Sequence, residues 1–150
     1  MVVLSAGMML APMAFAQSYV LTGINFPGAS FTSPIAINKL GVIVGAYQDS
    51  GGNSHGFSYS SGTSTSIDVP GAIHTEAWGI NDLSQIVGWY INPDFTVDGF
   101  ILSGGSFTTL DTGTEYTIAT GINNSGQVVG EFRGHGEPGV HGASGGAEPF

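Results

Sequence analysis

The side chains that could do chemistry in this chain are a few carboxylates and histidines placed next to turn-forming residues. Asp68 and Asp111 end similar apolar segments 43 residues apart, and His74 lies six residues after Asp68. As acid and base these three would suit a hydrolase or a lyase, because proton transfer requires titratable groups within hydrogen-bond reach of one substrate atom. The chain spreads such groups thinly, which favours a non-enzymatic protein. We therefore expect no catalytic residue, with a carbohydrate-active hydrolase or lyase as the alternative.

Three further acids, Asp49, Asp94 and Asp98, fall in segments that we expect to be loops between strands. Oxygen-rich loops can bind Ca²⁺, which takes several carboxylate and carbonyl oxygens. No Asp-x-Asp-x-Asp-Gly run is present, and an isolated turn Asp more often accepts hydrogen bonds from nearby backbone N–H groups. We expect no metal ligand and no cofactor, and a calcium-dependent glycan-binding module is a further alternative.

The positions of the histidines indicate structural roles and not metal binding. His55 and Asp98 occupy equivalent positions, so a metal site would need both to converge on one ion, and capping of a loop by hydrogen bonds is the better interpretation. Near the C-terminus, His135, Glu137 and His141 could form a weak surface metal site. The entropy of ordering a Gly-rich segment opposes such a site.

Two motif matches near the C-terminus lack the context that their chemistry needs. The segment GHGEPG at 134–139 fits the dinucleotide-binding pattern, but Pro138 and the Gly-rich continuation provide no helix for a pyrophosphate. The segment GASGG at 142–146 fits a nucleophile elbow around Ser144, yet only four residues follow it, too few to supply an acid and a histidine. We assign neither activity.

Aromatic side chains recur along the chain and could stack on a sugar ring where they are exposed. We expect most of them to pack between sheets instead, because large rings dominate the burial of apolar area. The members concerned are Tyr47, Phe57, Trp78, Trp89, Tyr90 and Phe100.

The composition excludes some partners. The chain of 150 residues has a formal charge of −9, and Lys39 and Arg133 are its only lysine and arginine. It cannot neutralise a row of phosphates, so nucleic acid and anionic membranes are not expected partners. With 41% hydrophobic residues and 25 glycines, the chain should fold into short strands joined by turns. Because it has no cysteine, disulfides cannot contribute to its stability.

The first residues differ from the rest and predict export. Residues 1–16 are apolar and end in Ala14-Phe15-Ala16, a small-x-small pattern typical of signal peptidase sites, although no Lys or Arg precedes the apolar run. We expect a signal peptide at 1–16, a repeat domain at 17–133 and a Gly/Pro-rich tail at 134–150. The mature protein would then be extracellular or periplasmic, with no membrane segment.

The repeat domain is defined by three segments of similar sequence. Ala36 to Tyr47 reads AINKLGVIVGAY, Gly79 to Tyr90 reads GINDLSQIVGWY, and Gly121 to Phe132 reads GINNSGQVVGEF. The Asn of each Ile-Asn pair recurs after 43 and then 42 residues, and segments upstream and downstream keep the same period. A fixed period of this length indicates one supersecondary unit repeated along the chain.

Each period reads as four short strands. An Asn followed three residues later by Gly or Ser predicts a type I turn closed by a residue at positive φ between the first two strands. The second strand carries an interior glycine, Gly45, Gly88 or Gly130, which predicts a bulge or a close backbone approach. Third strands begin near His55 and Asp98, and fourth strands end near Pro70 and Asp111. The chain should open on a fourth-type strand at 18–25.

Four antiparallel strands in about 43 residues are typical of a propeller blade, because one such sheet cannot bury both apolar faces alone. We therefore expect an all-β, β-propeller-like array. The pattern of HGF, IDVPGA, GIN and IVG segments resembles the HAF family of probable extracellular repeats over about 20–132. The resemblance implies export and propeller-like repeats, and it implies no catalytic residues. Asp98 and Ser84 depart from the family pattern, which has His and Gly at these places.

About three blade equivalents cannot close a ring, since propellers use at least about four. We expect either a piece of a longer array or a partner in an oligomer, with open strand edges that receive further repeats of the same type. The function indicated is an exported scaffold or binding module, whose partner would be a protein or a glycan.

Overall fold

The computed structural model describes residues 20–113 and 116–133, and within them the protein is all-β, with ten strands and no helix. The strands are β1 (Phe31–Ile37), β2 (Ile43–Gln48), β3 (Ser54–Ser60), β4 (Thr63–Ile67), β5 (His74–Ile80), β6 (Ile86–Ile91), β7 (Val97–Ser103), β8 (Ser106–Leu110), β9 (Tyr116–Ile122) and β10 (Val128–Arg133).

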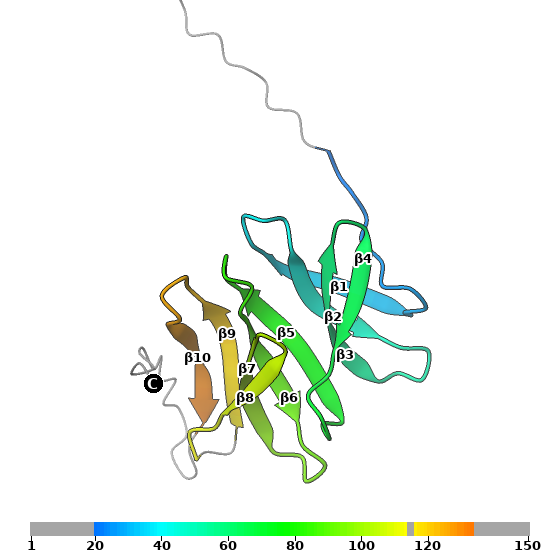
Figure 1. The fold of residues 1–150 in the computed structure, drawn as a ribbon. Helices are drawn as coiled ribbons and strands as arrows, with labels where there is room; N and C mark the ends of the chain where they lie inside the picture. Colours follow the sequence, from blue (N-terminus) through cyan, green and yellow to red (C-terminus); the bar gives the residue numbers. More distant parts are fainter. Residues whose placement is uncertain (1–19, 114–115, 134–150) are drawn as a thin grey trace, which may run out of the picture.

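The strands form two sheets, neither of which closes on itself (Figure 1). The first has the order β1-β2-β3-β4, and all its pairs are antiparallel. The second has the order β10-β9-β7-β6-β5, with β8 paired to β7. Strands β5 to β8 repeat the antiparallel meander of β1 to β4, while β9 joins β7 through a single parallel pair, Val97 with Tyr116. We call β1–β4, β5–β8 and β9–β10 repeats 1, 2 and 3.

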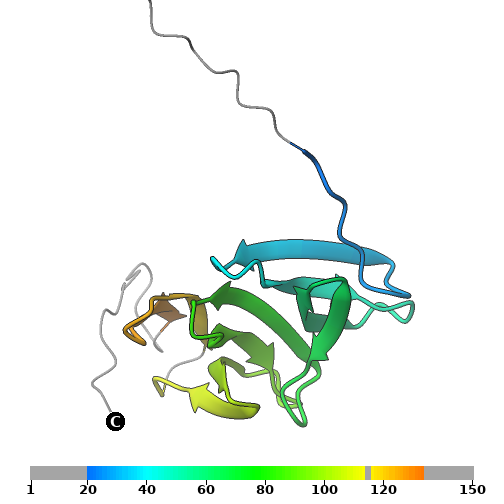
Figure 2. The ribbon, with the colours of Figure 1, turned by 45° about the horizontal axis from the view of Figure 1, so that its top comes forward.

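Consecutive repeats stack on one another. The first strand of repeat 2, β5, packs across β2 and β3 of repeat 1, and β9 packs in the same way across β6 and β7. Figure 2 shows the strands of repeat 1 lying over those of repeat 2. The stacking excludes water from equivalent side chains, since Phe57 and Phe100 are both 0% exposed. Burial of such rings stabilises the fold by about 2 kcal/mol or more each.

The turns between the first two strands of each repeat confirm the expected geometry. Gly41, Ser84 and Gly126 close them at φ values of 77°, 60° and 77°. In repeat 2, the N–H groups of Leu83 and Gln85 both donate to Asn81 Oδ1, at 3.0 and 2.9 Å. The other two repeats make the same pair of bonds, so one side chain organises each turn.

The same asparagines connect the repeats. Asn38 Nδ2 donates to the carbonyl oxygen of Asn81 at 3.0 Å, and Asn81 Nδ2 donates to that of Asn123 at 3.0 Å. The next position forms a second row, because the N–H of Lys39 donates to Asp82 Oδ1 at 3.0 Å and the N–H of Asp82 donates to Asn124 Oδ1 at 2.9 Å. We call these two rows the turn ladder.

The interior glycines of the second strands lie opposite a β-bulge, as the sequence predicts. The register of β1 with β2 shifts between Pro34 and Ala36, and that of β5 with β6 shifts between Ala77 and Gly79. A Cβ atom on Gly88 would overlap the carbonyl oxygen of Glu76 and reach 2.9 Å from the Phe100 ring. Gly45 and Gly130 face equivalent carbonyl oxygens, so the bulge needs glycine in all three repeats.

Two expectations about the strands are wrong. The fourth-type strand at 18–25 is not formed in its described part, where Val20 and Leu21 are 89% and 97% exposed. Its equivalent, β4, pairs with β3, and no described strand precedes 20–25 to pair with it. Asp98 lies within β7 rather than in the preceding loop, because its backbone pairs with Tyr90 of β6. The predicted signal peptide at 1–16 and the tail at 134–150 lie outside the described residues.

Candidate functional site

The largest group of interacting titratable side chains in repeat 1 centres on His55. Its Nδ1 lies 2.7 Å from Asp68 Oδ1, and its Nε2 lies 3.5 Å from Asp49 Oδ2. Ser66 Oγ donates to Asp68 Oδ2, and the hydroxyl of Tyr47 donates to Ser66 Oγ at 3.2 Å. The His55 ring also stacks on that of Tyr47, with centroids 5.0 Å apart.

These contacts shift the pKa values of His55 and Asp49. Burial lowers the pKa of His55, but the hydrogen bonds and charges of Asp68 and Asp49 together outweigh burial and raise it above its usual value. Hydrogen bonds from the side chain and backbone of Asn53 lower the pKa of Asp49 to about 2. His55 therefore holds the loop between β2 and β3 to the end of β4, a capping role of the kind that the sequence predicts.

Repeat 2 rebuilds this arrangement with other residue types. Asp98 replaces His55, and it accepts a hydrogen bond of 2.7 Å from Nδ2 of Asn92, which stands where repeat 1 has Asp49. An acceptor and a donor have exchanged places, so the contact survives without a histidine. Asp111, the equivalent of Asp68, accepts the N–H of Gly113 at 2.7 Å. Asp94 accepts both the N–H and the hydroxyl of Thr96, which lowers the pKa of Asp94.

A second group lies on β5 and β6, where Glu76 is held from two sides. His74 Nε2 lies 3.0 Å from Glu76 Oε1, and Trp78 Nε1 donates to Glu76 Oε2 at 2.8 Å. The His74 ring stacks on that of Trp89, with centroids 4.6 Å apart. Burial raises the pKa of Glu76, but the hydrogen bonds from His74 and Trp78 outweigh it and lower the pKa. Glu76 is therefore an ionised acceptor at neutral pH.

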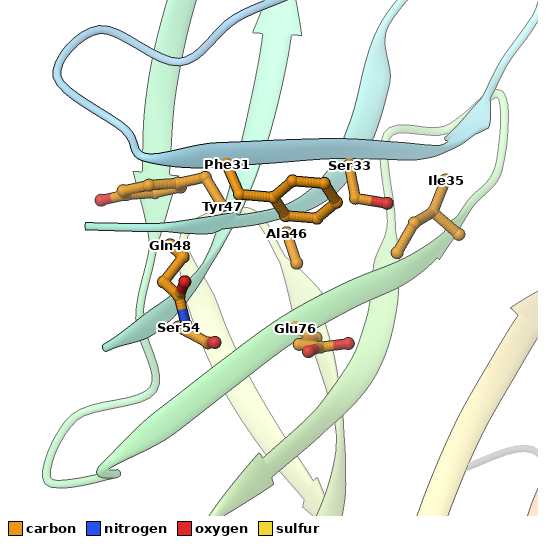
Figure 3. A pocket seen from close by; sticks show the side chains of 8 residues that line it. All are labelled: Phe31, Ser33, Ile35, Ala46, Tyr47, Gln48, Ser54 and Glu76. Carbon is orange, nitrogen blue, oxygen red and sulfur yellow. The ribbon is translucent and has the colours of Figure 1, made fainter. Parts of the chain in front are cut away.

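Two pockets lie between repeats 1 and 2, next to these groups. One, of about 220 Å³, lies where β1 of repeat 1 passes over β5. Figure 3 shows Phe31, Ser33 and Ile35 pointing from β1 toward Glu76. It is lined by Phe31, Ser33, Ile35, Ala46, Tyr47, Gln48, Ser54 and Glu76. The other, of about 280 Å³, contains His55, Asp68 and His74, together with residues of the turn before β5. Both are smaller than usual small-molecule sites, which span about 300–1,000 Å³.

The structure brings together two of the three residues that could act as acid and base. Asp68 and His74 do line one pocket, whereas Asp111 directly follows β8 in repeat 2 and does not line it. Ser66 Oγ donates to Asp68 and not to a histidine ring nitrogen, so it does not make the contact that activates a serine nucleophile. Within the described residues, no three His, Asp or Glu side chains converge in a way that could hold a metal ion. The motifs around 134–139 and Ser144, and the group of His135, Glu137 and His141, lie outside the described residues.

Some of the aromatic residues lie in the core, and others belong to the group around Glu76. Phe57 and Phe100 are fully buried and Tyr90 is 6% exposed, as expected for packing between sheets. Trp78 and Trp89 belong instead to the group around Glu76, which sequence reasoning missed. A signal was present, since Glu76 is a charged residue in the middle of the strand HTEAWGI, where a half-buried carboxylate needs donors nearby.

Comparisons with protein-family models, with curated proteins and with solved structures each returned no match to this chain. No helix long and apolar enough to cross a membrane occurs in the described part of the chain.

Proposed function

We propose that this chain is an exported, non-enzymatic repeat protein that serves as a scaffold, with its repeats stacked as in the propeller-like HAF family. The observation that carries the proposal is the turn ladder, which joins repeat 1 to repeat 2 and repeat 2 to repeat 3 through the same atoms. Most of the recurring positions serve this stacking. They are the turn asparagines, the bulge glycines and the buried valines and phenylalanines.

The state of the carboxylates supports a scaffold over a hydrolase or lyase. Asp49, Asp94 and Asp111 each accept backbone N–H groups of their own turns, and Glu76 is held by His74 and Trp78. A general acid must carry a proton near the working pH, and Asp49, with a pKa of about 2, does not. Contacts of this kind support a structural role for these carboxylates over general acid catalysis.

The enzyme alternative is tested by incubating the purified chain with a panel of polysaccharides and measuring new reducing ends and unsaturated products. We expect neither product above the buffer blank. Release of product by the unaltered chain that His74→Ala and Asp68→Asn both abolish would contradict the proposal. Export is tested separately by N-terminal sequencing of the secreted protein, where we expect the mature chain to begin after Ala16.

The pocket of about 220 Å³ favours a second candidate function, the binding of a neutral sugar. Phe31 is 64% exposed and offers a ring face, while the Glu76 carboxylate and the amide of Gln48 provide acceptors and donors for hydroxyl groups. A glycan array should then show a signal that both Phe31→Ala and Glu76→Gln remove. Phe95→Ala is the matched control, because Phe95 is 77% exposed and does not line this pocket. Repeating the array with and without Ca²⁺ tests the calcium-dependent alternative.

A further inference from the structure

The turn ladder runs in one direction, and within residues 20–113 and 116–133 nothing continues it beyond repeat 3. Asn81 Nδ2 uses two hydrogens, one on Gln85 Oε1 at 2.7 Å and one on the carbonyl oxygen of Asn123. Asn123 Nδ2 makes the first kind of bond, to Gln127 Oε1 at 2.7 Å, and has no partner of the second kind in the part of the chain that the structure describes. Among the described residues, the N–H of Asn124 has no acceptor, although its equivalent in Asp82 donates to repeat 3. The last rung therefore presents two donors that the earlier rungs use.

The apolar surface around this rung is open as well. Val44 and Val87, at the same position of β2 and β6, are 0% exposed because the next repeat covers them. Val129 of β10 occupies that position in repeat 3 and is 57% exposed. The face formed by β9 and β10 thus keeps the second-strand part of the contact and the two donors, while the third strand that also holds the successor of repeats 1 and 2 has no described counterpart in repeat 3.

The N-terminal end differs at one residue. In the second row of the ladder, Asp82 and Asn124 accept the N–H of the preceding repeat with a side-chain oxygen. Lys39 stands at that position in repeat 1 and has no acceptor atom. Its ammonium group instead lies 3.1 Å from Asp82 Oδ2 of repeat 2. The first row would still work, since the carbonyl oxygen of Asn38 accepts only the N–H of Gly41 and keeps a lone pair.

We propose that the β9–β10 face is a docking surface for a further repeat of the same type, one whose turn carries Asn followed by Asp or Asn. Lys39 offers no acceptor to the N–H of Asn124, so repeat 1 of a second copy would form only the first row of the ladder and dock more weakly than a repeat with Asp or Asn at this position. This inference rests on the proposed scaffold function and names its partner. Apart from Lys39, repeat 1 still offers an apolar surface that a β9–β10 face could cover, because Ile37 is 64% exposed whereas its equivalent Ile80 is 9% exposed.

A pair of complementary variants tests the docking. The unaltered chain has an open β9–β10 face and Lys39 at the other end. The double variant Lys39→Asn, Val129→Asp has a repaired first repeat and a blocked β9–β10 face. We expect each protein alone to be a monomer and the mixture to form a complex of one copy of each, measured by light scattering after size exclusion. Circular dichroism checks that each variant is folded.

Two controls separate the parts of the proposal. Replacing the unaltered chain by Val129→Asp should abolish the complex. Replacing the double variant by Lys39→Ala, Val129→Asp should weaken the complex about tenfold, because alanine restores no acceptor for the N–H of Asn124. A mixture of folded proteins with no complex overturns the docking surface, and equal binding of the Lys39→Ala form overturns the role of Lys39. Self-association of the unaltered chain also overturns that role.

Failure of this experiment is distinguishable from failure of the scaffold proposal. A stacked repeat protein that takes no further repeat would fail only the mixing experiment. An enzyme would release product from polysaccharides whether or not its repeats dock.

Discussion

Asn81 shows how much one side chain does in this protein. It is 3% exposed, and its amide accepts two N–H groups of its own turn, binds Gln85, and donates to the next repeat. Asn123 makes the corresponding bonds within its turn but is exposed and has no successor within the described residues. The two residues therefore separate the local role of the asparagine from its role between repeats.

We expect Asn81→Ala to lower the free energy of unfolding by about 3 kcal/mol, because it removes several bonds of a buried side chain at once and leaves partly buried N–H and carbonyl groups without partners. Asn123→Ala removes similar turn bonds from a solvated position and should cost about 1 kcal/mol. Urea denaturation of both variants measures the difference. Equal losses would mean that the bond between repeats contributes nothing to stability.

The contacts of His55 with Asp68 and Asp49 make the stability of the fold depend on pH. The pKa of His55 is raised in the folded protein, so its contribution is complete below the unfolded value of about 6.5 and is lost as the pH rises through the folded value. We expect the free energy of unfolding to fall across this window in the unaltered chain and to fall less in His55→Asn. The Hε1 resonance of His55 measures its titration directly, and a midpoint below 6.5 would contradict the assignment.

At the scale of elements, the bulge and its glycine form one device. The bulge inserts an extra residue into β1, β5 and β9, the first strand of each repeat, and β5 and β9 pack on the preceding repeat. A bulge bends a strand and increases its local twist. The glycine on the partner strand leaves room for the displaced carbonyl oxygen. The strand can therefore curve over its neighbour without losing its own partner.

Gly88→Ala should cost about 3 kcal/mol, because the new Cβ would overlap backbone that cannot move without separating β5 from β6. Gly23→Ala is the matched control, since nothing lies within 4 Å of a Cβ at that position, and its effect should stay within about 0.5 kcal/mol. Thermal unfolding followed by circular dichroism compares the two. A Gly88→Ala variant as stable as the control would show that the bulge can relax.

The local devices could be predicted from the sequence, and the contacts across strands could not. The Asn turn, the residue at positive φ and the glycine opposite a bulge depend on neighbours within a few positions, so their period reveals them. His55 meets Asp68 only because β3 pairs with β4 in one register, which no spacing in the sequence specifies. The group around Glu76 differs, because His74 and Glu76 are two residues apart on β5 and the alternation of a strand places them on one face.

At the scale of the whole molecule, the described repeats form a one-dimensional stack. Repeat 2 is covered on both sides, by repeat 1 through β5 and by repeat 3 through β6 and β7, whereas repeats 1 and 3 each have one described neighbour. In such arrays stability is close to a sum of the stability of each repeat and of its interfaces with neighbours. The middle repeat should then be the most protected part of the protein.

Hydrogen exchange tests this gradient. Amides of β6 and β7 should exchange at least about tenfold more slowly than those of β10, because opening β10 disrupts one interface and opening repeat 2 disrupts two. Asn81→Ala weakens the bond to repeat 3 and should speed exchange in β9 and β10 more than in β3 and β4. Val87→Ala should speed exchange throughout repeat 2, while Val129→Ala, at the equivalent exposed position, should change little. A single rate for all strands would mean that the three repeats unfold together, and the stack would then be one cooperative unit whose ends are as stable as its centre.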